Sequence, residues 1–348
     1  MPSFASTLIL WQRSHGRNDL PWQQACAYHV WLSEIMLQQT QVATVIPYFQ
    51  RFIASFPTID ALAQAPEDKV LAHWSGLGYY ARCRNLHRAA QIVVAQHGGE
   101  FPCKLEDVIE LPGIGRSTAA AICSLAYRQR HAILDGNVKR VLARYCGIEG
   151  SPAVKQVETR FWSRAESLLP QSDVDIYTQA LMDMGATLCT RSRPKCADCP
   201  VQRDCVAYQT GRVAELPTPR QRRAIPERSA TFLLAMSQGE ILLEKRGPSG
   251  IWGGLWCLPQ FDEPEEWQEY AEGWNVVSQI ELPVFTHTFT HFKLHITPLL
   301  MHLADKPAQP AVWLKVDQAL SAAIPTPVRV LLESMADQPA AISLRSDV

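Results

Sequence analysis

The spacing of apolar residues divides this chain into two parts. Up to about residue 210, apolar side chains recur every three or four positions, which is the period of an amphipathic helix. The helices predicted from this pattern are Val30–Phe56, Pro66–Leu71, Asn85–His97, Thr118–Tyr127, Val138–Tyr145, Val154–Leu168 and Ile176–Leu188. The first part of the chain is therefore predicted to fold as a helical domain.

The pattern changes after a segment that is rich in proline and arginine. Leu216–Pro226 has few apolar side chains to bury, which predicts a linker. Beyond it, alternating apolar residues predict strands, and helices are predicted to begin at Pro264 and at Pro327. The predicted strands are Ala230–Met236, Glu240–Lys245, Val284–Thr290 and Lys293–His302. The predicted organisation is a mostly α-helical domain at 1–212, a linker at 213–228 and an α+β domain at 229–348.

Charge is distributed unevenly along the chain. The whole sequence has a net charge of −1, but residues 1–212 hold 22 basic and 18 acidic residues, a net +4, and the rest hold 11 and 16, a net −5. The basic residues of the first part cluster at Arg82, Arg84 and Arg88, at Arg128 and Arg130, at Lys139, Arg140 and Arg144, and at Arg191, Arg193 and Lys195. Such clusters are compatible with phosphate binding, although most charged runs simply face solvent.

The N-terminus and the cysteine content bear on where the protein works. No stretch approaches the ~18 apolar residues that a membrane-spanning helix requires, and Ser6–Trp11 is too short an apolar run for a signal peptide. We therefore expect a cytoplasmic protein that does not enter a membrane. In such a reducing compartment, 10 cysteines point to metal ligation or burial rather than to disulfides.

Four of the cysteines form the strongest motif. Cys189, Cys196, Cys199 and Cys205 are spaced C-x6-C-x2-C-x5-C, in a polar, proline-interrupted loop that needs a metal to hold one shape. Four thiolates suit either a tetrahedral zinc ion or an iron–sulfur cluster. Zinc sites usually present two close pairs, whereas Cys189 stands apart from the others, which favours the cluster. The other six cysteines are scattered, and we expect them to be structural.

A second motif joins two predicted helices. Residues 111–119 read L-P-G-I-G-R-S-T-A, in which proline ends one helix, two glycines permit a tight turn and small residues begin the next helix. The backbone N–H groups of this helix–hairpin–helix pattern can hold a phosphate, although an ordinary turn between helices has the same residues. Asp135 follows about twenty residues later, before a helix led by Asn137. An acid there would at least interact with the helix dipole.

A third motif contains a carboxyl group among apolar residues. Glu34 lies in W-L-S-E-I-M-L-Q-Q-T-Q-V, residues 31–42. An apolar setting raises a carboxyl pKa and suits it to act as a general acid, whereas a lone glutamate is more often a surface residue of an amphipathic helix. The polar run Gln38–Gln41 is unusual beside a core, and it suits side chains inserted into a distorted duplex.

Together these motifs resemble the helix–hairpin–helix DNA glycosylases, in the branch that carries an iron–sulfur cluster. Residues 31–42, 76–87 (G-L-G-Y-Y-A-R-C-R-N-L-H) and 134–141 (L-D-G-N-V-K-R-V) resemble the MutY-type adenine DNA glycosylases in particular. The likeness is dense from Leu20 to Cys205 and looser beyond. It implies a base-excision repair enzyme that removes adenine mispaired with 8-oxoguanine or guanine from double-stranded DNA. The implied enzyme is a monomer associated with the nucleoid.

The resemblance also implies roles for single residues. Glu34 would protonate adenine, and Asp135 would stabilise the positive charge that develops on the sugar. The loop 189–205 would hold a [4Fe–4S] cluster. Ser117 stands where relatives that also nick the strand have a lysine, so the implied enzyme is monofunctional. Further implied contacts are Gln39 and Tyr79 around the 8-oxoguanine, Gly113 and Gly115 at a phosphate, and Trp22, Ser117 and Asp183 around the adenine.

The C-terminal part resembles a NUDIX domain through G-G-L-W-C-L-P at 253–259 and its strand pattern. The glutamate run of a working NUDIX hydrolase is missing, so we expect no nucleotide hydrolysis. Phe289, Thr290 and His291 match the hairpin with which these glycosylases read the opposite base, where serine is usual at the middle position. His287, His291 and His295 recur at even spacing, which predicts that they lie on one face of a strand. We do not expect them to bind a metal ion.

Two other functions compete with this interpretation. One is a pyrimidine-specific glycosylase that also nicks the strand, which Ser117, Glu34 and the additional domain all disfavour. The other is a non-enzymatic iron–sulfur protein that binds DNA or senses redox state. It would be favoured if Glu34→Ala left all function intact.

Overall fold

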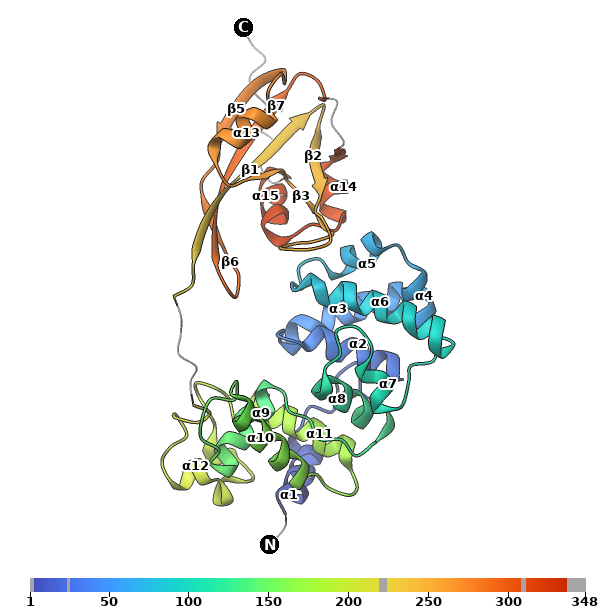
Figure 1. Ribbon diagram of the computed structural model, residues 1–348, viewed down its shortest axis with the longest axis vertical. Helices are drawn as coiled ribbons and strands as arrows, with labels where there is room; N and C mark the ends of the chain where they lie inside the picture. The colour runs from blue at the N-terminus through green and yellow to red at the C-terminus, as the bar shows by residue number, and fades with distance from the viewer. Residues whose placement is uncertain (1–2, 24–25, 219–223, 308–310, 337–348) are drawn as a thin grey trace. The chain divides into compact units, whose positions relative to one another are not determined.

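The computed structural model describes residues 3–23, 26–218, 224–307 and 311–336. Contacts divide the chain into two units, one of residues 1–64 and 85–222 and one of residues 65–84 and 223–348. In the described residues the first unit is helical and the second contains the sheet (Figure 1). The predicted fold class, a mostly α-helical domain and an α+β domain, is confirmed.

The first unit is built from helices that share an apolar core. Leu8, Leu142, Phe161 and Leu181 are among the side chains buried in it. The helices are α1 (Phe4–His15), α2 (Ala27–Leu37), α3 (Val42–Ser55), α4 (Ile59–Gln64), α6 (Tyr80–His97, whose first residues belong to the second unit), α7 (Leu105–Ile109), α8 (Arg116–Tyr127), α9 (Gly136–Cys146), α10 (Lys155–Ser167), α11 (Val174–Asp183) and α12 (Val206–Gln209). A π-turn at Met184–Leu188 extends α11, and 3-10 turns occupy Cys196–Asp198 and Gln202–Asp204.

One predicted helix is wrong in its extent. Val30–Phe56 was predicted to be continuous, but α2 ends at Leu37 and α3 begins at Val42. The break falls on the polar run Gln38–Gln41, where Gln39 adopts a positive φ of 60°. A left-handed residue cannot continue a right-handed helix. The break therefore gives the glutamines a turn of their own.

Helix α9 shows how the sequence sets both ends of an element. Asp135 caps its N-terminus by accepting a hydrogen bond from the Val138 N–H at 2.7 Å. Val141 and Leu142 bury its apolar face. Gly147 ends it in the left-handed region, with φ of 65°, where a Cβ would also lie 2.7 Å from Val206. The start of this helix is thus held at Asp135.

The second unit is built around a mixed sheet with helices. Its strands are β1 (Glu227–Ser237), β2 (Glu240–Lys245), β3 (Trp256–Cys257), β4 (Gln260–Phe261), β5 (Val276–Glu281), β6 (Phe285–Thr288), β7 (Lys293–Leu303) and β8 (Val312–Lys315). Its helices are α5 (Glu67–Trp74), α13 (Pro264–Tyr270), α14 (Val316–Ser321) and α15 (Thr326–Ala336). In the described residues, the order along the sheet is β3-β2-β1-β7-β5, with β4 on β1, β6 on β7 and β8 on β2.

The centre of this sheet is the parallel pair β1 and β7, which runs in register from Glu227 and Lys293 to Met236 and His302. Both strands are almost continuously buried over their second halves. Leu233 of β1 and Met301 of β7 belong to one apolar core of this unit. The other pairs are antiparallel. The predicted strands correspond to β1, β2, β6 and β7, whereas β3, β4, β5 and β8 were not predicted.

The boundary between the two parts of the sequence differs from the prediction. Leu216, placed in the expected linker 213–228, is 2% exposed and packs in the core of the first unit. Strand β1 already begins at Glu227. Residues 219–223 of that linker lie outside the described residues. The segment 65–84, expected in the helical domain, belongs with the second unit.

No helix in the described part of the chain has both the length and the apolar character that crossing a membrane would demand.

Candidate active site

Glu34 and Asp135, which are 101 positions apart in the sequence, lie close enough in the first unit for the charge of Asp135 to raise the pKa of Glu34. Glu34 is on α2, between the buried residues Ser33 and Ile35. Burial, together with the negative charge of Asp135, raises the pKa of the Glu34 carboxyl to about 8. A carboxylic acid with this pKa is protonated at neutral pH, so it can donate a proton.

Asp135 is held by the start of α9. Its carboxylate accepts hydrogen bonds from the Val138 and Asn137 N–H groups, and both lower its pKa, as do the nearby charges of Arg140 and Lys139. The surrounding protein nevertheless raises the pKa of Asp135 above its usual value, because desolvation outweighs these contacts. The site thus combines an acid that holds its proton with a second carboxylate fixed by backbone amides.

Ser117 fixes the backbone just before Asp135. Its Oγ accepts a hydrogen bond from the Leu134 N–H at 2.8 Å, which joins the second residue of α8 to the segment leading into α9. The hydroxyl therefore has a structural partner next to the carboxylate. It has no nitrogen nucleophile to offer.

The predicted hairpin turn lies between α7 and α8. Gly113 adopts φ of 81°, and a Cβ there would lie 2.9 Å from the Asn85 Cβ, so only glycine fits without a shift. Gly115 caps α8 in extended conformation, and nothing lies within 4 Å of where its Cβ would be. No side chain among the described residues caps the start of α8, which leaves its first amide groups available to a phosphate.

The turn between α2 and α3 presents Gln39 to solvent. Gln39 is exposed and takes its positive φ in the middle of the polar run. Gln38 is partly buried, and its Nε2 donates to Thr118 Oγ1 at 3.4 Å, which connects the turn to α8. The turn is thus anchored on one side and exposes Gln39 on the other.

Asp183, expected in the adenine pocket, is fully buried at the end of α11. Its carboxylate accepts from Gln12 Nε2 at 2.9 Å, from Gln179 Nε2 at 2.8 Å, and from the backbone and guanidinium of Arg17 at 2.5 to 2.8 Å. These contacts hold the segment after α1 against α11. Gln12 and Arg17 were not predicted, because hydrogen bonds across 171 and 166 positions leave no local pattern. Gln179 lies one helical turn before Asp183 on α11, and this spacing could have indicated it.

The same network reaches the segment that carries Trp22. Gln23 Nε2 donates to the Arg17 carbonyl at 2.7 Å, and Gln23 Oε1 accepts from the Leu20 N–H at 3.1 Å. Trp22 is 5% exposed and packs edge-on against Phe49, with ring centroids 5.3 Å apart. Asp183 therefore helps to position Trp22, while contact of either residue with adenine stays a prediction.

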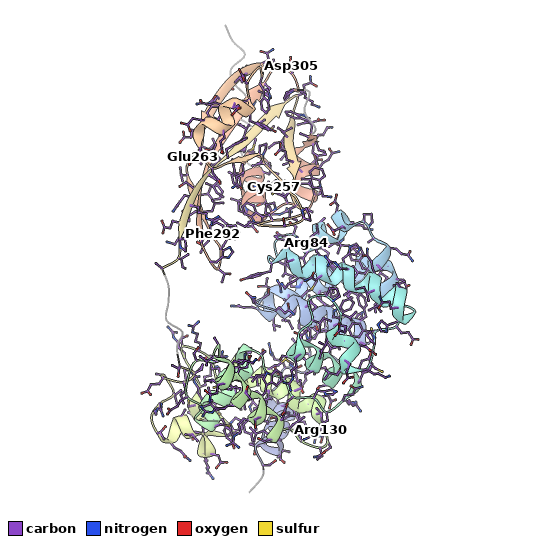
Figure 2. All side chains as sticks on the ribbon, viewed as in Figure 1. Arg84, Arg130, Cys257, Glu263, Phe292 and Asp305 are labelled. Carbon is purple, nitrogen blue, oxygen red and sulfur yellow. The ribbon has the colours of Figure 1, made fainter. Side chains whose placement is uncertain are left out.

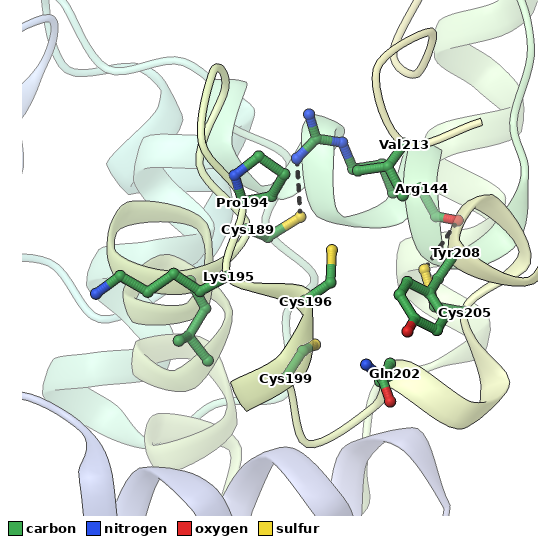
Figure 3. A pocket seen from close by; sticks show the side chains of 11 residues that line it. Arg144, Cys189, Pro194, Lys195, Cys196, Cys199, Gln202, Cys205, Tyr208 and Val213 are labelled. Atoms are coloured by element: carbon green, nitrogen blue, oxygen red, sulfur yellow. Dashed lines mark hydrogen bonds between the residues drawn. The ribbon is translucent and has the colours of Figure 1, made fainter. Parts of the chain in front are cut away.

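The four motif cysteines line one pocket in the first unit. Figure 3 shows Cys189, Cys196, Cys199 and Cys205 around it, beside Arg144. Arg144 Nη1 donates to Cys189 Sγ at 3.4 Å, and Cys205 Sγ donates to the Arg144 carbonyl at 3.4 Å. Among the described residues, no three histidine, cysteine, aspartate or glutamate side chains are grouped tightly enough to hold a single metal ion. The donor set, four thiols around one pocket, fits an iron–sulfur cluster.

Part of the predicted basic surface is interior. Arg144 is 4% exposed and donates to the carbonyls of Thr190, Arg191 and Leu216. Arg140 bonds the carbonyls of Cys189 and Gly185 and the Asn137 side chain. Arg82, in the second unit, is 9% exposed and bonds the Gly78 carbonyl. These arginines satisfy backbone carbonyls, so they do not form a phosphate-binding surface as their clustering suggested.

Phe289, Thr290 and His291 form the tip of the hairpin between β6 and β7 in the second unit. The Phe289 N–H donates to the Phe292 carbonyl at 2.9 Å, which closes the turn. The Phe289 ring stacks on that of Phe292 at 4.4 Å and lies 5.3 Å from Trp252. Figure 2 labels Phe292, the residue that follows the tip, in the unit that contains the sheet. Thr290 and His291 are exposed. Packed aromatic rings thus support two exposed polar side chains at the tip of the hairpin.

Tyr79 is brought to this tip within the same unit. Its hydroxyl lies 2.6 Å from Thr290 Oγ1, and the residue is 44% exposed. Tyr79 has φ of 52°, after Gly76 and Gly78, which also have positive φ. The structure thus unites Tyr79 and Thr290, which are 211 positions apart in sequence.

The predicted alternation of three histidines on one strand is wrong. His287 belongs to β6, His295 to β7, and His291 lies in the turn between them. His295 pairs with Glu227 at 3.0 Å, and burial lowers the pKa of His287. The histidines therefore lie on two strands and the turn between them, and not on a single strand.

Both parts of the chain match known protein families. Residues 32–167 match the HhH-GPD superfamily of base excision DNA repair proteins. Residues 230–334 match the NUDIX domain family. The helical match contains both Glu34 and Asp135, and the NUDIX match contains the hairpin tip.

Curated relatives match nearly the whole chain. An adenine DNA glycosylase of Buchnera aphidicola (subspecies Acyrthosiphon pisum) is 38% identical over 95% of this chain and 97% of its own length. An adenine DNA glycosylase of Mus musculus is 34% identical over 96% of this chain and 78% of its own length. Both likenesses span the helical part and the NUDIX part.

Solved structures resemble the helical part. A thermostable thymine-DNA glycosylase superposes with a TM-score of 0.54 at 28% identity, over 60% of this chain and 95% of that one. Endonuclease III in a non-covalent DNA complex superposes with a TM-score of 0.51 at 19% identity, over 60% of this chain and 94% of that one, which shows a shared fold.

Proposed function

Because the chain belongs to the adenine DNA glycosylase family, we propose that it removes adenine paired with 8-oxoguanine or guanine from duplex DNA. It is a base-excision repair glycosylase, an enzyme that hydrolyses N-glycosyl bonds. The observation that carries the proposal is the pair Glu34 and Asp135, an acid that keeps its proton beside a carboxylate fixed at a helix start. We expect a cytoplasmic monomer that acts on nucleoid DNA.

Glu34 supplies the proton that makes adenine a leaving group. In the proposed step it protonates N7 of a flipped adenine, and the electrons of the bond between C1′ and N9 pass to the base. Its pKa of about 8 keeps the proton available at neutral pH, where an ordinary glutamate would have lost it. Flipping costs a few kcal/mol and is easier at a mispair.

Asp135 stabilises what remains on the sugar. Bond cleavage leaves oxocarbenium character at C1′, and a carboxylate beside it stabilises the positive charge. Backbone hydrogen bonds from α9 hold Asp135 in place for this. Water then adds to C1′ and releases a proton, leaving an abasic site and free adenine.

The reaction ends at the abasic site in this proposal. A strand-nicking glycosylase needs an amine that forms a Schiff base with the sugar. At position 117 the chain has a serine, whose hydroxyl is bonded to the Leu134 N–H. This supports a monofunctional enzyme.

DNA recognition is proposed to use residues of both units. In the first unit, exposed Gln39 wedges the duplex, and the amides after Gly113 and Gly115 hold a phosphate. Trp22 and Asp183 contribute to the adenine pocket. In the second unit, Tyr79 and the tip at 289–291 read the 8-oxoguanine opposite.

Cys189, Cys196, Cys199 and Cys205 would hold a [4Fe–4S] cluster. The pocket that these thiols line, with the Arg144 guanidinium at Cys189, supports this. The cluster would hold the loop 189–205 in one conformation, since the 3-10 turns within this loop are only three residues long.

Single-turnover cleavage tests the function directly. Wild-type and Asp135→Asn proteins are incubated with a duplex containing adenine opposite 8-oxoguanine, and alkali is added afterwards to break abasic sites. We expect alkali-dependent cutting of the adenine strand by the wild type and loss of cutting by Asp135→Asn, which keeps a good helix cap. No cutting by a brown, cluster-loaded wild type would overturn the proposal in favour of DNA binding or redox sensing.

A further inference from the structure

Residues 65–84 are attached to the rest of the second unit at several points. Asp68 pairs with Lys245 at 2.6 Å, and Arg84 donates to the Gly253 carbonyl. The Tyr79 hydroxyl bonds Thr290. A fourth attachment, at Ser75, differs from the others because it is buried.

The Ser75 hydroxyl both donates and accepts a hydrogen bond. Its Oγ donates to the Ile324 carbonyl at 2.7 Å and accepts from Arg329 Nη2 at 3.3 Å. Ser75 is 7% exposed and Ile324 is completely buried, so water cannot replace this bond. By contrast, Asp68 and Lys245 are each 43% exposed, and such a pair contributes little. The Ser75 contact is therefore expected to dominate the attachment.

A short rigid turn connects Ser75 to Tyr79. The Trp74 indole N–H donates to the Gly78 carbonyl at 3.1 Å, which also accepts from Arg82 Nη2 at 3.2 Å. The Arg82 guanidinium lies over the Trp74 and Tyr79 rings at 5.5 and 5.3 Å. A displacement at Ser75 would consequently move Tyr79 rather than be absorbed in the turn.

We propose that Ser75 and Arg329 are positioning residues for discrimination of the opposite base. The Ser75 attachment sets where Tyr79 meets Thr290, and thereby the shape of the surface that receives 8-oxoguanine. The inference rests on the proposed function, because it presumes that this tip reads the opposite base. Ser75 bonds Ile324 and Arg329, which are 249 and 254 positions away in the sequence, so neither motif nor spacing identified these residues.

The test compares two duplexes, with adenine opposite 8-oxoguanine and opposite guanine, cut by the full-length protein under single turnover. Ser75→Ala removes the donor and leaves the Ile324 carbonyl unpaired, and Arg329→Met removes the second contact while keeping an apolar stem. We expect Ser75→Ala to lower the preference for the 8-oxoguanine duplex by roughly tenfold. The loss should appear as a higher protein concentration needed for half of the maximal rate on that duplex. The plateau rate opposite guanine should be unchanged, and Arg329→Met should act in the same direction to a smaller extent.

Two controls separate positioning from a general loss of structure. Ser75→Thr keeps the hydroxyl and should keep the preference, and Lys245→Ala removes an exposed attachment and should also keep it. An unchanged preference in folded Ser75→Ala would overturn the inference, as would equal losses on both duplexes. If the wild type cuts neither duplex, the proposed function fails, which is a different outcome.

Discussion

The two units differ in how far the protein shapes the titration of their functional residues. In the first unit, Glu34 is half-buried and Asp135 reaches solvent, and desolvation is the largest cause of the raised pKa of each. In the second unit, Tyr79 is 44% exposed and bonds exposed Thr290 at a hairpin tip. Partial desolvation shifts the acid chemistry of the first site, whereas the polar groups of the hairpin tip remain exposed.

The proposed function needs both kinds of site in one chain. Proton transfer to a poor leaving group requires an acid whose pKa the protein has moved, and moving it requires removing water. Discrimination between guanine and 8-oxoguanine requires polar groups and a ring that are accessible until DNA arrives. Changes at Glu34 or Asp135 should therefore alter the rate on every substrate, and changes at the hairpin tip should alter the preference between the two duplexes.

Glu34→Gln should give the largest effect. Glutamine keeps the size of the side chain but has no acidic proton, so the single-turnover rate should fall by about 10²–10⁴ fold. The fall should be the same opposite 8-oxoguanine and opposite guanine, with an unchanged melting temperature. Glu149→Gln, which alters an exposed carboxylate paired with Arg212, serves as the control. A loss confined to one duplex would contradict the division of roles.

The pH dependence should separate the two carboxyl groups. Glu34 acts as the acid while protonated, so the rate should decline by about tenfold per pH unit above its pKa of about 8. Asp135 acts ionised, and because its pKa is raised, the acid limb should lie above the range of an ordinary aspartate. Rates measured across pH in Glu34→Gln should lack the alkaline limb. Persistence of that limb in the variant would assign it to another group.

Cys199→Ser should affect folding more than either chemistry or preference. Serine is a poor ligand for iron, so the variant should purify with less iron and melt on the order of 10 °C lower. Iron analysis and calorimetry measure both effects. Cys103→Ser, at an exposed cysteine outside the pocket, should leave iron content and melting temperature unchanged. Full iron content in Cys199→Ser would exclude this cysteine as a ligand.

Thr290→Val should give the smallest effect and the most selective one. Valine keeps the shape but removes the partner of the Tyr79 hydroxyl, so preference for 8-oxoguanine should drop by about fivefold. Tyr79→Phe alone should do the same, and the double variant should lose little more, since both remove one bond. Thr288→Val, on neighbouring β6, is the matched control. Additive losses in the double variant would show that the two hydroxyls act separately.

Local patterns in the sequence determined the elements and several of the site residues. The helical period before residue 210 and the alternation after it predicted both folding classes, because side-chain burial follows the geometry of each element. Asp135 was predicted to stand at a helix start, and the structure confirms it as the cap of α9. Glu34 was predicted to have a raised pKa, and it has one. Strand β5 was missed because nearly all of it is exposed and it shows no alternation.

Tertiary structure decided which distant residues meet. No local pattern indicates that Asp183 holds Arg17, that Ser117 holds Leu134, or that Arg144 is buried beside the cysteines. Nor does one indicate that residues 65–84 join the second unit, with Ser75 bonded to Ile324 and Tyr79 bonded to Thr290. Periodicity records only how each element faces its own surroundings. Hydrogen bonds between distant segments depend on packing in three dimensions, where a buried polar group must find its partner.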